Sequence, residues 1–486
     1  MRTLPVLTVF LLVASVTAQP SLDEPSLGET SFENSGAEAA QAPFLRGLLL
    51  LHSFEYRDAR EAFQEAREID PDFAMAAWGE AMTHNHPIWL RQDREAALEA
   101  LGRLGDDWAT AGATARENAY LGTLAVLFGE GDKEDRDDAY AEAMAALAAA
   151  YPDDLDAQAF YALALLGTAH EGRDFTTYMR AAAVAEEVFA ANPRHPGAAH
   201  YLIHAYDDPV HAPLGLRAAR VYDQIAPAAS HALHMPSHIY LALGMWDETA
   251  EMNRRSYEAA RANTDARGEP LNGHGWHALW WWHYAETQRD DPEAARRLYD
   301  LAVDLAAADP DGRTAQAHIV RIRSEHAVAF GAFDVFEASS PGNISISTAA
   351  VDLLARGMAR SVQRDPAGAE AALAQLQARL DADDDPSWTA RAAALQLEAV
   401  VRLGAADPEA ALALAEEAAQ VENEAPLTFG PPAPVIPTNE MMGRLLLDLG
   451  RPAEAAVAFE AALARAPGRR QALAGLAEAE ALMAAR

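Results

Sequence analysis

Apolar and polar positions form their clearest pattern near the C-terminus, in EMMGRLLLDLGRPAEAAVAFEAALARAPGRR (440–470). Leu449 and Gly450 end one predicted helix, Ala453 to Ala464 form the next, and Pro467 follows as a stop signal. No part of the chain shows the strict alternation that is typical of a half-buried strand. The pattern therefore predicts two helices joined by a short turn.

The same order of turn, helix and terminal Pro recurs along the chain. A short turn carrying Gly or Asp precedes an Ala and an aromatic residue four positions apart, and a Pro often closes the unit. The other examples are residues 56–71, 243–260 and 290–310. These units resemble the tetratricopeptide repeat (TPR) family, over most of residues 43–486 and more weakly around 330–350 and 420–438.

The resemblance implies an all-α fold. In TPR proteins antiparallel helix pairs stack into an α-solenoid, a right-handed superhelix that shares one continuous core. The first helix of each pair lines a concave groove, where ligands bind. The segments 73–89, 200–215 and 230–248 also resemble an exported bacterial TPR group, which implies nothing firm about the chemistry.

The first residues have the layout of a secretory signal. Arg2 is basic, an apolar run extends from Leu4 to Val16, and small residues lead to Ala18. The run is shorter than the roughly 20 residues that a membrane span needs, and no later segment is apolar for long enough. We therefore expect residues 1–18 to be a signal peptide and the protein to be exported, to the periplasm or the extracellular space.

The rest of the chain divides into three predicted parts by composition and repeat pattern. Residues 19–42 read as a flexible acidic linker, because they are rich in Ser, Glu, Gly and Ala without periodicity. Residues 43–340 form a His-bearing TPR array. Residues 341–486 form C-terminal TPR-like repeats, with a Pro-rich loop at 427–438 and a terminal cap helix from Gln471 to Ala485.

Charge and cysteine content exclude several functions. The formal net charge is −35, so the chain lacks the basic surface that nucleic-acid binding needs. Cysteine is absent, which removes disulfides, thiolate ligands and Cys-based redox catalysis. Any metal must be held by His, carboxylate, amide or Met side chains.

A histidine signature occurs twice, 34 residues apart. HYLIHAY (200–206) and HMPSHIY (234–240) both read His-x-x-x-His-x-Tyr, and 34 residues is the TPR period. Histidines four apart lie about 5–6 Å from one another on a helix, so each pair can contact one ion. Tandem duplication alone would also copy the signature. Pro236, inside the second copy, predicts a kink or a helix start.

The distribution of histidines favours function over ancestry. All 16 lie between His52 and His326, and none occurs in the last 160 residues. Farther upstream, Glu80 and His84 are four apart on a predicted helix and His86 precedes Pro87. The predicted metal ligands are His200, His204, His234, His238, His84, His86 and Glu80. The predicted ligand-binding residues are His52, His231, His277, His283, Tyr206 and Tyr240.

Imidazoles with a carboxylate suit a transition metal, here of the copper or zinc class. The first hypothesis is thus an exported TPR solenoid with a His-lined, metal-binding groove. The first alternative is a TPR scaffold that binds a protein or peptide partner without metal. The second is a metal-dependent enzyme that uses the same pocket, although HExxH, P-loop and GxGxxG motifs are absent.

Overall fold

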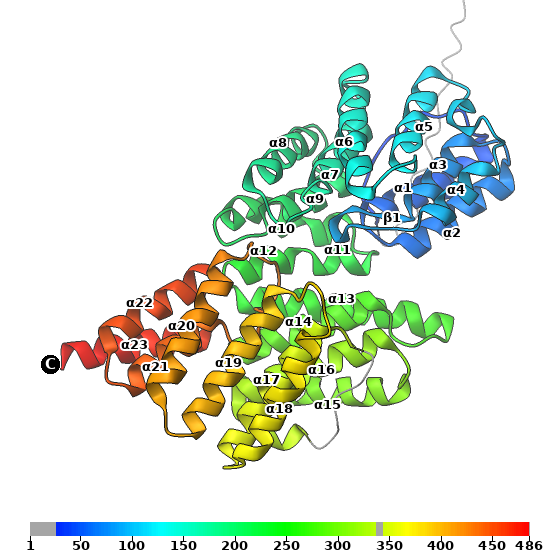
Figure 1. Ribbon diagram of the computed structural model, residues 1–486. Helices are drawn as coiled ribbons and strands as arrows, with labels where there is room; N and C mark the ends of the chain where they lie inside the picture. Colours follow the sequence, from blue (N-terminus) through cyan, green and yellow to red (C-terminus); the bar gives the residue numbers. More distant parts are fainter. Residues whose placement is uncertain (1–25, 337–343, 486) are drawn as a thin grey trace, which may run out of the picture.

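The computed structural model describes residues 26–336 and 344–485, and nearly all of this chain is helical (Figure 1). The predicted signal peptide and the boundary at 340/341 lie outside these residues. The α-helices of the first half are α1 (Gln41–His52), α2 (Tyr56–Ile69), α3 (Ala74–Met82), α4 (Arg94–Gly102), α5 (Ala115–Leu127), α6 (Lys133–Ala150), α7 (Leu155–Leu166), α8 (Phe175–Ala191), α9 (Pro196–Tyr206), α10 (Ala212–Ile225), α11 (Ser230–His234) and α12 (Pro236–Ala242).

The second half is built in the same way. Its α-helices are α13 (Trp246–Arg267), α14 (Gly273–Gln288), α15 (Pro292–Ala308), α16 (Arg313–Phe330), α17 (Ile346–Val362), α18 (Pro366–Leu380), α19 (Trp388–Gly404), α20 (Pro408–Glu424), α21 (Thr438–Asp448), α22 (Pro452–Arg465) and α23 (Arg470–Ala484). The shorter elements are the 3-10 helices at Glu38–Ala40, Pro87–Trp89, Trp108–Thr110 and Phe333–Phe336, and a hairpin of β1 (Asn85–His86) and β2 (Arg91–Gln92).

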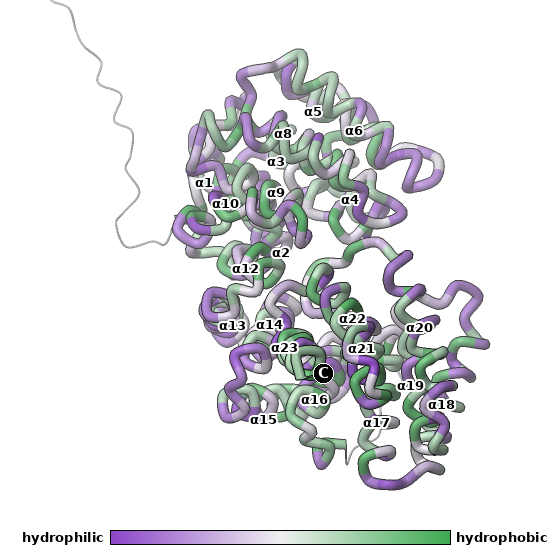
Figure 2. Tube along the Cα trace, turned by 90° about the vertical axis from the view of Figure 1, so that its left-hand side faces the viewer, coloured by the Kyte–Doolittle hydropathy of each residue, from purple (hydrophilic) through white to green (hydrophobic). Residues whose placement is uncertain are grey.

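Consecutive helices pack against each other as antiparallel pairs, and the pairs stack into a curved array (Figure 1). The all-α prediction is confirmed, and the architecture is that of a TPR-like helical repeat. Hydrophobic and hydrophilic stretches alternate along the helices in Figure 2, as expected of amphipathic helices. Buried alanines recur at the helix contacts, where a small side chain lets neighbouring helices approach closely.

The C-terminal end of the array returns to its middle. The turn before α23 meets the turn before α13, where a Cβ on Gly468 would lie 2.8 Å from the Cα of Gly244. Trp246 donates its indole N–H to the carbonyl of Gly468 at 3.0 Å, and Arg469 donates to the hydroxyl of Tyr284 at 3.2 Å. The last repeats therefore cover one side of the central helices.

The first helix pair covers another side of the central helices. Arg57 on α2 forms ion pairs with Glu269, just beyond α13, and Arg267 of α13 pairs with Asp58 and Glu61. These contacts join residues more than 200 positions apart. They hold the α1–α2 turn against α11.

Residues 26–36 differ from the flexible linker predicted for 19–42. Phe32 is buried among core aromatic rings, Thr30 donates to Asp156 at 2.8 Å, and the amide of Glu29 donates to the carbonyl of Arg194. Helix α1 itself begins at Gln41. Composition does not reveal this packing, because one aromatic side chain and a few hydrogen bonds are enough to anchor a polar, non-helical segment.

The Pro-rich segment between α20 and α21 forms a non-helical connection that starts at Ala425. It runs back to the central helices, where a Cβ on Gly430 would approach the Trp281 ring to 2.8 Å. The ring of Phe429 lies 5.8 Å from that of His238.

Within residues 26–336 and 344–485, no helix is both long and apolar enough to cross a membrane.

Candidate metal centre

Six histidines from four central helices gather in the middle of the array. Helix α9 supplies His200 and His204, α11 supplies His231 and His234, α12 supplies His238 and α14 supplies His277. They form two groups, in each of which one ligand atom per residue lies within 4.8 Å of the others. We call His200, His204 and His231 the first group, and His234, His238 and His277 the second group.

Pro236 breaks the helix between α11 and α12 but preserves its direction. Met235 keeps helical dihedral angles, with φ −54° and ψ −38°. Pro236 has no N–H, so a backbone hydrogen bond is lost there. Because the backbone at Met235 stays helical, His234 and His238 remain neighbours with the i,i+4 spacing. His231 faces α9 instead and joins the first group.

The first group holds three buried ring nitrogens without partners. The Nδ1 of His200 lies 2.7 Å from the carbonyl oxygen of His52, so it carries the proton that donates to this acceptor. Its Nε2 is therefore a lone pair. Across the described residues, the buried Nε2 atoms of His200, His204 and His231 find no hydrogen-bond partner. Such orphaned buried atoms are uncommon and indicate a site where an ion or a water molecule binds.

The second group brings two lone pairs face to face. His234 donates from Nδ1 to Asn253 Oδ1 at 2.6 Å, and the Asn253 amide is oriented because its nitrogen donates to the carbonyl of Thr249 at 2.8 Å. His238 donates from Nδ1 to Asp207 at 2.5 Å. Both Nε2 atoms are then unprotonated in the neutral rings, yet they lie 3.0 Å apart.

The two groups are adjacent. The rings of His231 and His234 approach to 5.9 Å, and those of His204 and His238 also approach to 5.9 Å. Trp281 closes the second group, with its ring 4.4 Å from that of His238. The six imidazoles thus form one continuous, enclosed cluster.

Burial favours the neutral imidazole at His200, His204, His231 and His234. It lowers the pKa of His200 to about 3, and it lowers the pKa values of His204, His231 and His234 well below the usual range, with further lowering from neighbouring histidines. A neutral imidazole is the form that binds metal. These four rings are therefore in the form that can bind a cation.

A third cluster, His52, Asp156 and His195, also has ligand-like spacing, but its ring nitrogens have hydrogen-bond or ion-pair partners within the protein. His52 bonds through Nε2 to Asp156 at 2.8 Å and through Nδ1 to the Tyr201 hydroxyl at 2.9 Å. His195 accepts from the amide of Ala198 through Nδ1, while its Nε2 lies 3.3 Å from Asp156. We call this the structural triad.

The upstream residues predicted as metal ligands lie apart from these groups. Helix α3 ends at Met82, so the predicted face shared by Glu80 and His84 does not form. Glu80 instead forms ion pairs with Arg67 and Arg103. The hairpin begun at Asn85 turns the chain away at this point.

Other predicted residues also have different neighbours. His86 stacks on Tyr56 at 3.9 Å. His283 approaches His326, with Nε2 and Nδ1 3.2 Å apart, beside Glu325, whose pKa burial raises to about 8. The hydroxyl of Tyr206 meets Glu186. Tyr240 is buried at the end of α12, beyond the histidine groups.

Sequence reasoning missed the residues that orient the rings. Asp207 and Asn253 fix the tautomers of His238 and His234, whereas Glu55 accepts from the backbone amide of His231 at 2.9 Å and so holds the main chain of α11 in place. Asp207 directly follows the first His-x-x-x-His-x-Tyr signature, so its position gave a usable signal. Asn253 and Glu55 lie in distant repeats and had none.

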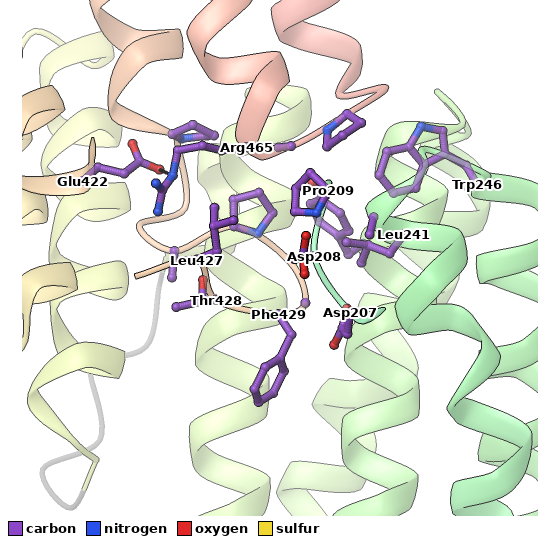
Figure 3. A pocket seen from close by; sticks show the side chains of 18 of the residues that line it. Asp207, Asp208, Pro209, Leu241, Trp246, Glu422, Leu427, Thr428, Phe429 and Arg465 are labelled. Atoms are coloured by element: carbon purple, nitrogen blue, oxygen red, sulfur yellow. Dashed lines mark ion pairs between the residues drawn. The ribbon is translucent and has the colours of Figure 1, made fainter. Parts of the chain in front are cut away.

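Figure 3 shows a pocket whose lining residues Asp207 and Phe429 also contact His238 of the second group. Its walls are the turn at Asp207 and Asp208, the aromatic rings of Trp246 and Phe429, and Arg465 on α22. Asp207 belongs both to this pocket and to the hydrogen bond with His238. The pocket therefore connects the surface with the edge of the histidine cluster.

No protein-family model matches the chain, and no curated protein is similar to it. Solved structures that match this chain in a structural comparison include the yeast Tom70, with 13% identity, TM-score 0.38 and coverage of 92% of this chain and 96% of that one. The human IFIT1 dimer with m7Gppp-AAAA has 12% identity, TM-score 0.41 and 91% coverage of each chain. Rap protein complexed with competence and sporulation factor has 12% identity, TM-score 0.40 and coverage of 80% and 98%. At these TM-scores the overall shapes differ, so the likeness carries no function to this chain.

Proposed function

We propose that this protein is an exported, TPR-like scaffold that binds a transition metal of the copper or zinc class in its central histidine cluster. The observation that carries the proposal is the pair of Nε2 atoms of His234 and His238, 3.0 Å apart with both Nδ1 atoms engaged. Two lone pairs at that distance repel each other unless a cation lies beside them. Nitrogen donors select transition metals over calcium or magnesium.

The oriented rings support this proposal further. A metal-binding histidine usually donates its other N–H to a carboxylate or carbonyl-type oxygen, which fixes the tautomer. His238 does so to Asp207, His234 to Asn253, and His200 to the carbonyl of His52. The alternative is a proton shared between His234 and His238, balanced by Asp207.

A peptide groove without metal fits the histidines less well. The side chains of both groups are buried, apart from the half-buried His277, so a peptide laid on the surface would not reach most of them. The metal-dependent enzyme remains a second candidate because of the pocket in Figure 3, which would admit a small molecule to the edge of the centre.

Elemental analysis of untagged, full-length protein tests the proposal. The protein is stripped with a chelator, incubated separately with copper and zinc, and desalted. We expect at least one tightly held ion per chain, and a higher melting temperature because only the native state binds it. Absence of stoichiometric copper and zinc would leave the shared proton as the explanation and overturn the proposal. Detection of the chain in the cell's exported fraction tests the localisation.

A further inference from the structure

We infer that the cluster holds two cuprous ions side by side, one in each three-histidine group. This inference rests on the proposed function and deepens it, because it names the number of ions and their oxidation state. It follows from the donor count, the spacing of the groups and the charge of their surroundings.

Each group is a complete donor set by itself. The first group offers the unpartnered Nε2 atoms of His200, His204 and His231. The second offers His234, His238 and His277. One ion bound in the second group would leave three buried lone pairs of the first group unsatisfied, which is costly for buried polar atoms. Two ions satisfy both groups.

The spacing suits a pair of neighbouring ions. Rings of opposite groups come within 5.9 Å at two places. The helices α11 and α12, which carry rings of both groups, are separated in the chain by Met235 alone. Ions in two-metal sites are usually about 3.5–4 Å apart. Two adjacent three-nitrogen sites are compatible with that range.

Charge selects the oxidation state. Two divalent ions would bring four positive charges into a buried cluster of imidazoles, where, among the described residues, Asp207 is the carboxylate that hydrogen-bonds to a ring of either group. The other nearby acids already have partners, since Asp208 pairs with Arg173 at 3.2 Å and Glu55 accepts from the backbone amide of His231 and lies 3.3 Å from the Nδ1 of His274. Buried charge without compensation is expensive. Two monovalent ions halve that excess, and copper is the metal of the proposed class that has a monovalent state.

Coordination chemistry agrees with the charge. Neither group includes a carboxylate among its ligand atoms in the described chain. Three neutral nitrogen donors complete the shell of a cuprous ion, whereas divalent zinc at three protein ligands keeps a fourth position for water. The enclosed first group, whose three residues are all buried, favours the ion that needs no fourth ligand.

The test is an anaerobic titration of metal-free, full-length protein with Cu(I) against the competing chelator bicinchoninate. We expect two equivalents of Cu(I) per chain, with X-ray absorption showing about three nitrogen neighbours per copper. His204→Ala and His277→Ala should each reduce the stoichiometry from two to one. Neither imidazole makes a hydrogen bond to the described residues, so these changes remove no structural bond. His170→Ala, at a half-buried histidine outside both groups, should keep two equivalents.

The outcomes separate this inference from the function on which it rests. One tightly held copper per chain would overturn the pair and leave metal binding intact. Two zinc ions held more tightly than two cuprous ions would overturn the oxidation state. Failure to hold either metal would overturn both proposals. If a variant does not fold, the wild-type stoichiometry and absorption spectrum still decide.

Discussion

The histidine cluster and the structural triad lie side by side and differ in what their nitrogens do. Both are buried, and both have the spacing of metal ligands. In the triad His52 has hydrogen-bond partners at both ring nitrogens, and the Nε2 of His195, which makes no hydrogen bond, faces the Asp156 carboxylate at 3.3 Å. In the described structure, three Nε2 atoms of the cluster have neither a hydrogen bond nor a carboxylate partner. Proximity and burial therefore do not separate candidate ligands from structural histidines, but the partners of each ring nitrogen do.

Position relative to a helix end explains the difference. His195 precedes α9, and its Nδ1 accepts the amide of Ala198 as an N-cap, which satisfies one of the free N–H groups of the first turn. His200 and His204 lie within the same helix, where backbone amides already have partners. Their side chains are free to meet α11.

The largest expected effect comes from removing one ligand of each histidine group. The double variant His204→Ala, His238→Ala should lose stoichiometric metal, with an affinity loss well beyond the roughly 10–100-fold of an indirect change. Differential scanning calorimetry with and without copper or zinc measures the result, because metal-dependent stabilisation should disappear. An unchanged metal-induced shift would show that the cluster is not the site.

Acidification should destabilise the metal-free protein by several kcal/mol through both regions. Burial lowers the pKa of His52 to about 4 and that of His200 to about 3, against about 6.5 in the unfolded chain. The unfolded state then binds more protons in this window, so the free energy of unfolding falls as the pH falls from 6.5 toward 4. Each pKa unit is worth about 1.4 kcal/mol. Urea unfolding at pH 7 and pH 5 measures it, and equal stability would contradict neutral burial.

Asp156→Asn should affect stability and leave metal binding alone. The change removes the carboxylate that forms a hydrogen bond with His52 and lies beside His195. Because hydrogen bonds to charged groups are worth about 1.5–3 kcal/mol, we expect the free energy of unfolding to fall by about that amount. Chemical denaturation measures the loss, and metal titration of the same sample should give the wild-type stoichiometry. A loss of metal in a folded variant would mean that the triad is a ligand set, which would erase the distinction drawn above.

Asp207→Asn should give the smallest effect of the four, in affinity rather than stoichiometry. The amide can still accept from His238 but lacks the negative charge, so we expect metal affinity to fall by roughly 10–100-fold. Competition with a chelator measures this change, with Asp138→Asn as a control, at a carboxylate that contacts His170 instead. Unchanged affinity would argue against a role for Asp207 in holding the ligand.

The elements themselves were largely predictable. Helix α22 (Pro452–Arg465) and α23 (Arg470–Ala484) agree with the helices expected at 453–464 and 471–485, because apolar periodicity and Pro signals are local. The His200/His204 and His234/His238 pairs were visible for the same reason. The face expected for Glu80 and His84 did not form, because the hairpin at Asn85 ends α3 early.

The sequence by itself determined the all-α class, the repeat and the helical spacing of the His200/His204 and His234/His238 pairs, since these depend on residues within one or two turns. Tertiary structure decided which histidines meet. His277, on α14, joins His234 in the second group, and Asn253, on α13, fixes the tautomer of His234. Asp156 forms a hydrogen bond with His52, which is 104 residues away in the sequence. Such partners are set by how repeats stack and by where the chain returns on itself. No local pattern encodes that geometry, because it arises from the summed packing of many small contacts.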